Sequence, residues 1–199
     1  SRAFEQVTCS LPDIVIYEIR KFFSLGAKCN PNILECLWVP PDLILKETIA
    51  GTVLRVHRDK FLSSLAFKSF SGYAVSQLNS LKKVPAEGSP RALAYGKCGY
   101  DAKFGMHLVR LLRMLGEILK DGELIVRRHD ADVLLDIRKG NWSEARLIAE
   151  VLRLETENKK LSKTTSLPEN PDRDFLDSLC MEIIRVTDVT SALEKFDVL

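Results

Sequence analysis

The sequence predicts an α+β protein that is mostly helical, in which a short strand-forming start precedes a helical body. The strand-forming start is the β-branched run DIVIY in residues 13–17. Strand signals almost vanish after Pro41, and apolar residues then recur at helical spacing. This spacing is clearest in residues 99–124, GYDAKFGMHLVRLLRMLGEILKDGEL, where the leucines form one broad apolar stripe. We therefore expect this segment to be a core-facing helix.

Before residue 41 we expect a strand, a helix and a second strand. The first ten residues, SRAFEQVTCS, show no convincing element of their own. Asp13 begins the β-branched run, and the helix that follows is expected to end between Gly26 and Asn30. Residues 33–39 form an apolar run between two proline signals, which favours a short strand.

After residue 41 the expected elements are almost all helices. They are a long amphipathic helix over 59–81 capped by Asp59, a loop over 84–99, the helix over 99–120, a brief extended stretch at 125–128, a short helix over 130–140 stopped by Gly140, a helix that Trp142 opens, a linker over 163–172 and a last helix over 172–196.

Composition narrows the class of protein. A chain of 199 residues with 46% hydrophobic content can bury a substantial core. It has no apolar run near 18 residues and no signal-peptide pattern, so we expect a cytoplasmic protein without a membrane partner. A net charge of +2 requires any basic site to be local. Five cysteines without a CxxC spacing argue against a disulfide framework or a zinc cluster.

The helix over 99–120 also carries a basic edge. Lys103, His107 and Arg110 fall within about 60° of one another on the helical wheel, away from the leucines. Taken alone, this spacing favours a solvated flank.

Common catalytic motifs are absent from the sequence. It contains no GxSxG, HExxH, P-loop or GxGxxG pattern, and its three histidines lack metal-ligand spacing. Two Asp-x-Asp pairs occur, in HDAD and PDRD, and both are interpreted as carboxylates at helix starts.

Several sequence blocks in order carry more information than any single motif. They are DIVIYEIRKFF, NPNILECLW, KFLSSLAFKSFSGYAVSQL, GYDAKFGMHLVRLL, DGELIVRR and LLDIRKGNWS, which run from residue 13 to residue 143 within a similar region of about residues 13–150. This set resembles predicted nucleotidyltransferases of the DNA polymerase beta superfamily, in the branch associated with RNA ligases. The resemblance implies two Mg²⁺ (or Mn²⁺) ions held by carboxylates and transfer of a nucleotide from an NTP to an acceptor hydroxyl, with RNA repair or modification as the setting.

The resemblance also implies a division of the chain. Residues 1–40 would be the C-terminal part of a nucleotidyltransferase core with a remnant of its sheet, 41–163 a helical domain, and 164–199 a linker and C-terminal helix. Asp13 matches the third metal-binding carboxylate of the superfamily. The Gly-Ser and Asp-x-Asp motifs that should come before it are not among the twelve preceding residues. We expect the N-terminal catalytic half to lie outside these 199 residues, and a pseudoenzyme that has lost it is the alternative.

The same resemblance turns the basic edge into a candidate ligand site. Lys103, His107 and Arg110 would then bind NTP phosphates or an RNA backbone. Further candidates are Lys60, Lys68, Tyr73, Asn30 and Glu35. For the two lysines the alternative is a solvated charge, for Asn30 a turn in NPN, and for Glu35 a place at the sheet edge.

Two other functions remain open from the sequence. One is a non-catalytic helical module that binds RNA or a protein partner, which the missing motifs favour. The other is a helical ribonuclease with His107 as general base, although no partner residue is evident. Metal dependence distinguishes the ribonuclease from the nucleotidyltransferase, because the ribonuclease would work in EDTA and nucleotidyl transfer would not.

Overall fold

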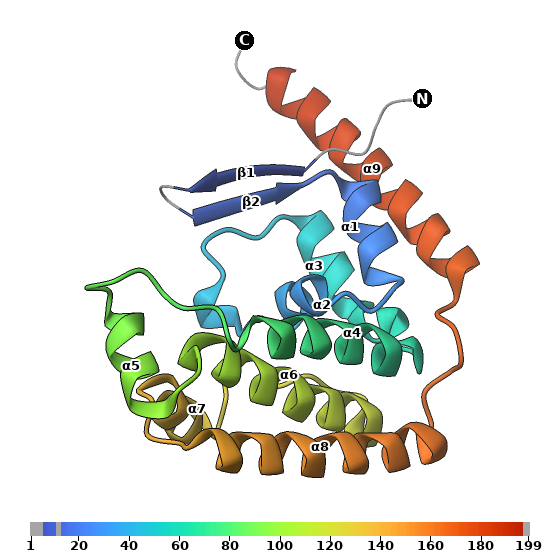
Figure 1. The fold of residues 1–199 in the computed structure, drawn as a ribbon. Coiled ribbons are helices and arrows are strands. Elements are labelled where there is room, and N and C mark those ends of the chain that lie inside the picture. The colour runs from blue at the N-terminus through green and yellow to red at the C-terminus, as the bar shows by residue number, and fades with distance from the viewer. Residues whose placement is uncertain (1–5, 11–12, 197–199) are drawn as a thin grey trace.

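A computed structural model describes residues 6–10 and 13–196 of the chain, and in it a small β-hairpin sits at one end of a helical body (Figure 1). Strand β1 (Gln6–Ser10) pairs antiparallel with β2 (Asp13–Tyr17), so that Gln6 lies opposite Tyr17 and Ser10 opposite Asp13. The expectation of no element in the first ten residues is wrong for residues 6–10. A strand at this position depends on pairing with β2, which local propensity does not reveal.

The rest of the described chain is helical, which confirms the prediction of a mostly helical α+β protein. The helices are α1 (Ile19–Gly26), α2 (Pro31–Leu37), α3 (Ile49–Val56), α4 (Leu65–Ser80), α5 (Pro90–Cys98), α6 (Ala102–Asp121), α7 (Ala131–Arg138), α8 (Glu144–Thr164) and α9 (Arg173–Phe196), with 3₁₀ turns η1 (Pro41–Leu43) and η2 (Arg58–Phe61). Within the described residues, none of these helices combines the length and the apolar character needed to cross a membrane.

Helix α6 is the centre of the fold, with α4 packed along one side and α8 along the other (Figure 1). It begins where the buried Asp101 side chain accepts a hydrogen bond from the Lys103 backbone N–H, and it ends at Gly122, whose φ is +67°. Its buried leucines divide between two core clusters. Leu111 and Leu115 belong to the cluster with α1, α2, α4 and α9, whereas Leu108 belongs to the cluster with α5, α7 and α8. The predicted core-facing helix is confirmed.

Three expected elements differ from the structure because capping residues were given the wrong role. Residues 33–39 are mostly helical, since the Asn30 side chain caps α2 and Pro31 occupies its first turn. The loop expected over 84–99 contains α5, which Ser89 caps in the same way. The helix expected over 59–81 is divided into η2 and α4, and Asp59 caps neither. Residues 125–128, which we expected to be briefly extended, form no regular element.

The later elements match their predictions. Helix α7 ends just before Gly140, Ser143 caps α8, and α9 follows the expected linker. The division into three segments stays a prediction. One core cluster includes buried residues from all three of them, such as Phe23, Leu115 and Leu179.

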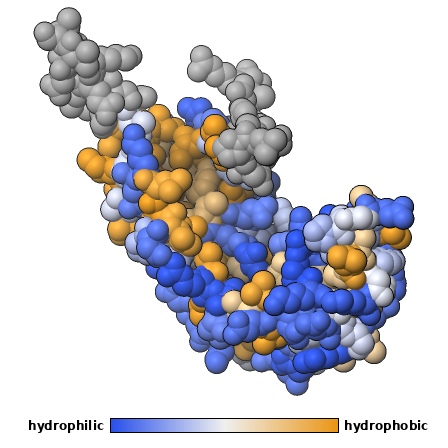
Figure 2. Space-filling view, turned by 90° about the vertical axis from the view of Figure 1, so that its left-hand side faces the viewer, coloured by the Kyte–Doolittle hydropathy of each residue, from blue (hydrophilic) through white to orange (hydrophobic). Residues whose placement is uncertain are grey.

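The hydropathy of the surface changes from the hairpin to the helical layers. On the face seen in Figure 2, hydrophobic side chains gather over the upper part and hydrophilic side chains dominate the lower part. Exposed hydrophobic residues among the first 50 positions include Ile14, Val15, Ile16, Leu45 and Ile49.

We expect Gly105→Ala to destabilise the protein by about 1–2 kcal/mol. A Cβ at residue 105 would lie 2.6 Å from Tyr100 Cε2 and 3.1 Å from Leu147 Cδ2. Tyr100 is fully buried and its hydroxyl donates to the Trp142 carbonyl at 3.2 Å, so the ring cannot easily move. Overpacking of about 1–3 kcal/mol therefore exceeds the gain of about 1 kcal/mol in helix propensity.

Urea unfolding measures this difference, and Gly72→Ala in α4 is the matched control. A Cβ at residue 72 meets no atom within 4 Å, so this variant should be neutral or slightly more stable. Equal stability of the two alanine variants would contradict the steric argument.

Candidate functional site

The basic edge of α6 lines a pocket. Lys103, His107 and Arg110 face a cavity of about 350 Å³, together with residues of α2 and α4. Helix α2 contributes Asn32 and Glu35, α4 contributes Tyr73 and Gln77, and α6 adds Phe104 and Leu111. The structure thus brings the three predicted basic residues together in one concave site, which we call the α6 pocket.

Glu35 is the only acidic side chain among the residues that line the α6 pocket, and it forms an ion pair with Arg110. Both side chains are largely buried, with 23% of each exposed. Burial raises the pKa of Glu35, although the positive charges of Arg110 and Arg128 act in the opposite direction. Glu35 therefore lies on a helix facing the pocket, and the alternative of a sheet edge is wrong because no strand forms here.

His107 is a neutral imidazole at pH 7. Burial is the largest cause, and together with the positive charges of Arg110, Lys103 and Arg138 it lowers the pKa of His107 to about 4. The imidazole consequently offers one N–H donor and one acceptor nitrogen to a ligand. The same cations create a positive potential in the pocket that favours an anionic ligand.

Asn30 holds two walls of the α6 pocket in place. Its Oδ1 accepts a hydrogen bond from the Asn32 backbone N–H at 3.0 Å, and its Nδ2 donates to the Tyr73 hydroxyl at 2.6 Å. Asn30 therefore caps α2 and positions Tyr73 instead of forming the expected turn, and its role in ligand binding stays a prediction.

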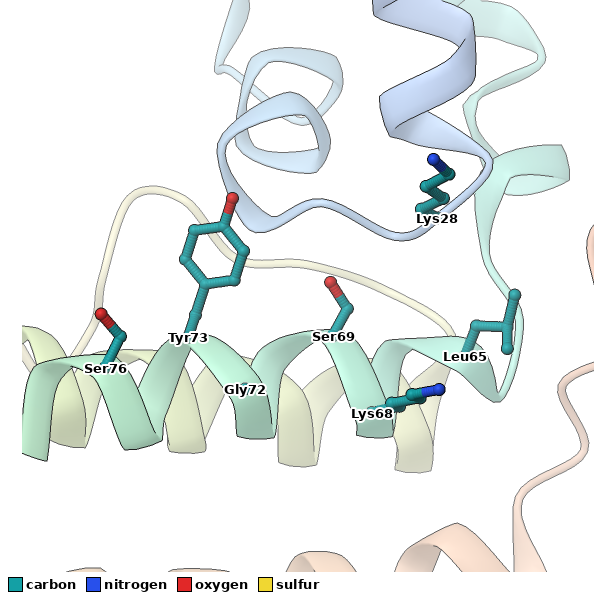
Figure 3. A pocket seen from close by; sticks show the side chains of 7 residues that line it. All are labelled: Lys28, Leu65, Lys68, Ser69, Gly72, Tyr73 and Ser76. Carbon is teal, nitrogen blue, oxygen red and sulfur yellow. The ribbon is translucent and has the colours of Figure 1, made fainter.

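Lys68 and Lys60 occupy different places. Lys68 lines a neighbouring cavity of about 620 Å³ with Lys28, Leu65, Ser69, Gly72, Tyr73 and Ser76 (Figure 3). Tyr73 lines both this cavity and the α6 pocket, so the two are adjacent. Lys60 lines neither cavity, and it pairs with Asp59 at 3.2 Å on an exposed turn.

Asp13 begins β2, but its side chain lies outside the part of the chain whose side chains the structure describes. At the other end of β2, the phenol of Tyr17 lies close enough to Cys36 and Tyr73 for both to raise its pKa, after the larger effect of burial. Asp13 is four residues away, about 13 Å along an extended strand. Strand β2 therefore leads from Asp13 to a wall of the α6 pocket, and the metal role of Asp13 stays a prediction.

The two Asp-x-Asp pairs have structural partners. Asp130, just before α7, pairs with Arg113 at 2.6 Å and Arg128 at 2.8 Å, and Asp172 accepts from the Phe175 backbone N–H at 3.0 Å. In the part of the chain that the structure describes, no group of three or more histidine, cysteine or acidic residues is placed to hold a metal ion.

Sequence reasoning missed Arg138. This residue is the last of α7, and its charge acts on His107 of α6. The adjacent basic residues in IRKG were an available signal, but nothing local indicated that α7 would bring them beside α6.

The described chain is thus a mostly helical protein with a β-hairpin and a basic, concave pocket that favours anionic ligands. The model of the RNA repair pathway DNA polymerase beta family matches residues 4–182, so the chain belongs to this family. This finding confirms the resemblance to RNA-ligase-associated nucleotidyltransferases. No curated protein and no solved structure is significantly similar to the chain.

Proposed function

We propose that this protein transfers a nucleotide from an NTP to an acceptor hydroxyl of RNA, with Mg²⁺ or Mn²⁺ as the metal. Membership of an RNA repair family supports the class of reaction. The observation that carries the proposal is the α6 pocket, in which Lys103 and Arg110 flank a neutral histidine. Basic side chains in a concave site stabilise the negative charge of phosphoryl groups.

The residues of the α6 pocket have distinct roles in this proposal. Lys103, for which the structure shows no ion pair among the described residues, binds a phosphate oxygen as a point charge. Arg110 presents its guanidinium with an orientation set by Glu35. His107 donates a neutral N–H hydrogen bond.

The metal would be held by carboxylates outside the described side chains. A bound Mg²⁺ or Mn²⁺ would polarise the phosphoryl oxygens and favour ionisation of the acceptor hydroxyl. Asp13 is the single candidate ligand, and the described residues do not form a metal site by themselves. The Gly-Ser and Asp-x-Asp motifs of the superfamily have no counterpart before Asp13 in this sequence.

We expect Lys103→Ala in the complete gene product to lower the rate of metal-dependent transfer by about tenfold or more. A charge-assisted contact to phosphate is worth about 1.5–3 kcal/mol, and 1.4 kcal/mol is a factor of ten. Transfer of labelled nucleotide to an RNA end, measured across NTP concentrations, gives the change. Stability should hardly change, because the side chain is not part of either core cluster.

Lys120→Ala is the matched control, since Lys120 is an exposed lysine in the last turn of the same helix. It should leave the transfer rate unchanged. Equal transfer rates in the wild type, Lys103→Ala and Lys120→Ala would mean that Lys103 is a solvated charge and does not bind the substrate.

A non-catalytic RNA- or protein-binding module is the second candidate, because the expected catalytic motifs are missing from this sequence. If the complete gene product binds RNA but transfers no nucleotide from any NTP with Mg²⁺ or Mn²⁺, this second function is correct. Cleavage of RNA that persists in EDTA would instead identify a ribonuclease.

A further inference from the structure

A second basic pocket lies between α5 and α7, beside the α6 pocket. This α5–α7 pocket has a volume of about 540 Å³. Five of its lining residues are cations, and none is acidic: Arg91, Lys97, Lys103, Arg138 and Lys139. In a chain whose net charge is only +2, such a local excess of positive charge favours an anionic ligand.

Two arginines of this pocket have nitrogens without partners. Arg91 Nε and Arg138 Nη1 are buried, and among the described residues neither has a hydrogen-bond partner. Arg91 already pairs through Nη2 with the buried Asp101. A buried donor without an acceptor costs free energy, and an anion in the pocket would supply acceptors to both guanidinium groups.

The shape of the α5–α7 pocket depends on a glycine. Gly140 has a φ of +74°, and a Cβ at this position would lie 2.7 Å from the Ala94 carbonyl oxygen of α5. The turn after α7 can approach α5 this closely only without a side chain at residue 140. This close contact places Arg138 and Lys139 opposite Lys97 of α5 in the same pocket.

The α5–α7 pocket is adjacent to the α6 pocket, which is in turn adjacent to the Lys68 cavity. Lys103 lines both the α5–α7 pocket and the α6 pocket, and Tyr73 lines both the α6 pocket and the Lys68 cavity. We call these three adjacent cavities the groove, and lysine or arginine lines each of them. Glu35 is the only acidic residue that lines any of the three.

We propose that this groove binds the phosphate backbone of single-stranded RNA, with the α5–α7 pocket as a phosphate subsite next to the α6 pocket. Cations spaced along a groove match the regular charges of a nucleic-acid strand. The rings of Tyr73 and Phe104 line the central part, where unpaired bases can stack. The proposal rests on the proposed function in one respect, because the bound strand is taken to be the acceptor.

The test measures binding without chemistry. A labelled oligouridylate of about 12 nucleotides is titrated with the 199-residue chain in EDTA and without NTP, and fluorescence anisotropy is followed at several salt concentrations. Lys97→Ala/Lys139→Ala should weaken binding at least about tenfold at low salt. It should also reduce the slope of log K against log salt by about 1.4, since each phosphate contact to a single strand contributes about 0.7.

Lys159→Ala/Lys160→Ala is the matched control, because both lysines are exposed on α8 and the charge change is the same. It should bind RNA like the wild type. Equal weakening by both double variants, or an unchanged slope in Lys97→Ala/Lys139→Ala, would overturn the proposal. Competition by polyglutamate as effective as that by unlabelled RNA would also overturn it and indicate an acidic peptide ligand.

Arg138→Gln provides a second variant that removes charge while keeping much of the side-chain volume. Thermal unfolding of each variant shows whether the fold is retained. The binding assay contains neither metal nor NTP, so it does not depend on the transfer reaction. If Lys97→Ala/Lys139→Ala weakens RNA binding but the protein transfers no nucleotide in a separate assay with metal and NTP, only the proposed function is refuted. Transfer to RNA with unchanged affinity in the Lys97→Ala/Lys139→Ala variant would refute only the groove.

Discussion

Asp13→Asn in the complete gene product is expected to reduce metal-dependent nucleotidyl transfer by on the order of 10³-fold. The resemblance assigns Asp13 to the metal site, and a carboxylate ligand helps to supply several kcal/mol of charge stabilisation in the transition state. Asparagine keeps the size of the side chain but removes its negative charge. The measurement is the single-turnover rate of transfer at saturating NTP, with Mg²⁺ and then with Mn²⁺.

Asp59→Asn is the control for this prediction. Asp59 is exposed on η2 and pairs only with the neighbouring Lys60 among the contacts that the structure shows. It should leave transfer unchanged. If Asp13→Asn retains wild-type kinetics while the protein is active, Asp13 is not a metal ligand, whatever the family implies.

Arg113→Ala is expected to destabilise the protein by about 3 kcal/mol. Arg113 of α6 pairs with Asp130 at 2.6 Å and with Glu150 of α8 at 2.9 Å, and no more than 19% of any of the three side chains is exposed. Removal of the arginine leaves the buried carboxylates of Asp130 and Glu150 with less opposing positive charge, and breaking a buried ion pair in this way costs about 3–5 kcal/mol. The expected value is at the low end because Arg128 still pairs with Asp130 and Arg153 with Glu150. Urea unfolding at pH 7 measures it.

The same network predicts how stability depends on pH. Burial opposes ionisation of Asp130, but hydrogen bonds from Arg128 and Arg113 outweigh it and lower the pKa to about 2. Hydrogen bonds from Arg153 and then Arg113 lower the pKa of Glu150 to about 2. In the unfolded chain both groups titrate near pH 4, so the unfolded state binds more protons between about pH 4.5 and 2.

Stability from this network should therefore be complete above about pH 4.5 and decrease as the pH falls toward 2. Unfolding at a series of pH values tests this, and Arg113→Ala should show a weaker dependence than the wild type. Arg127→Ala is the control, because Arg127 and its partner Asp42 are both 61% exposed and solvent screens such a pair. A wild-type pH profile in Arg113→Ala would contradict the assigned role of the network.

The sequence was most informative where a pattern extends over several turns. Twenty residues of α6 contain enough repeats to fix both its core face and its basic edge, and α9 was expected over nearly its observed length. Short elements were predicted less well. The residues that begin α2 and α5, Asn30-Pro31 and Ser89-Pro90, are used in turns as readily as in helix caps, so their local signal was ambiguous.

The sequence by itself determined the mostly helical class, the family and the three basic residues on one edge of α6. Only the tertiary structure decided that this edge lines a pocket, that Glu35 pairs with Arg110 at a sequence separation of 75, and that the charge of Arg138 acts on His107. The physical reason is that helical periodicity is local and depends on neighbours three or four residues away. The meeting of α2, α5 and α7 around α6 instead depends on how separate apolar faces share two cores, and no single segment encodes that arrangement.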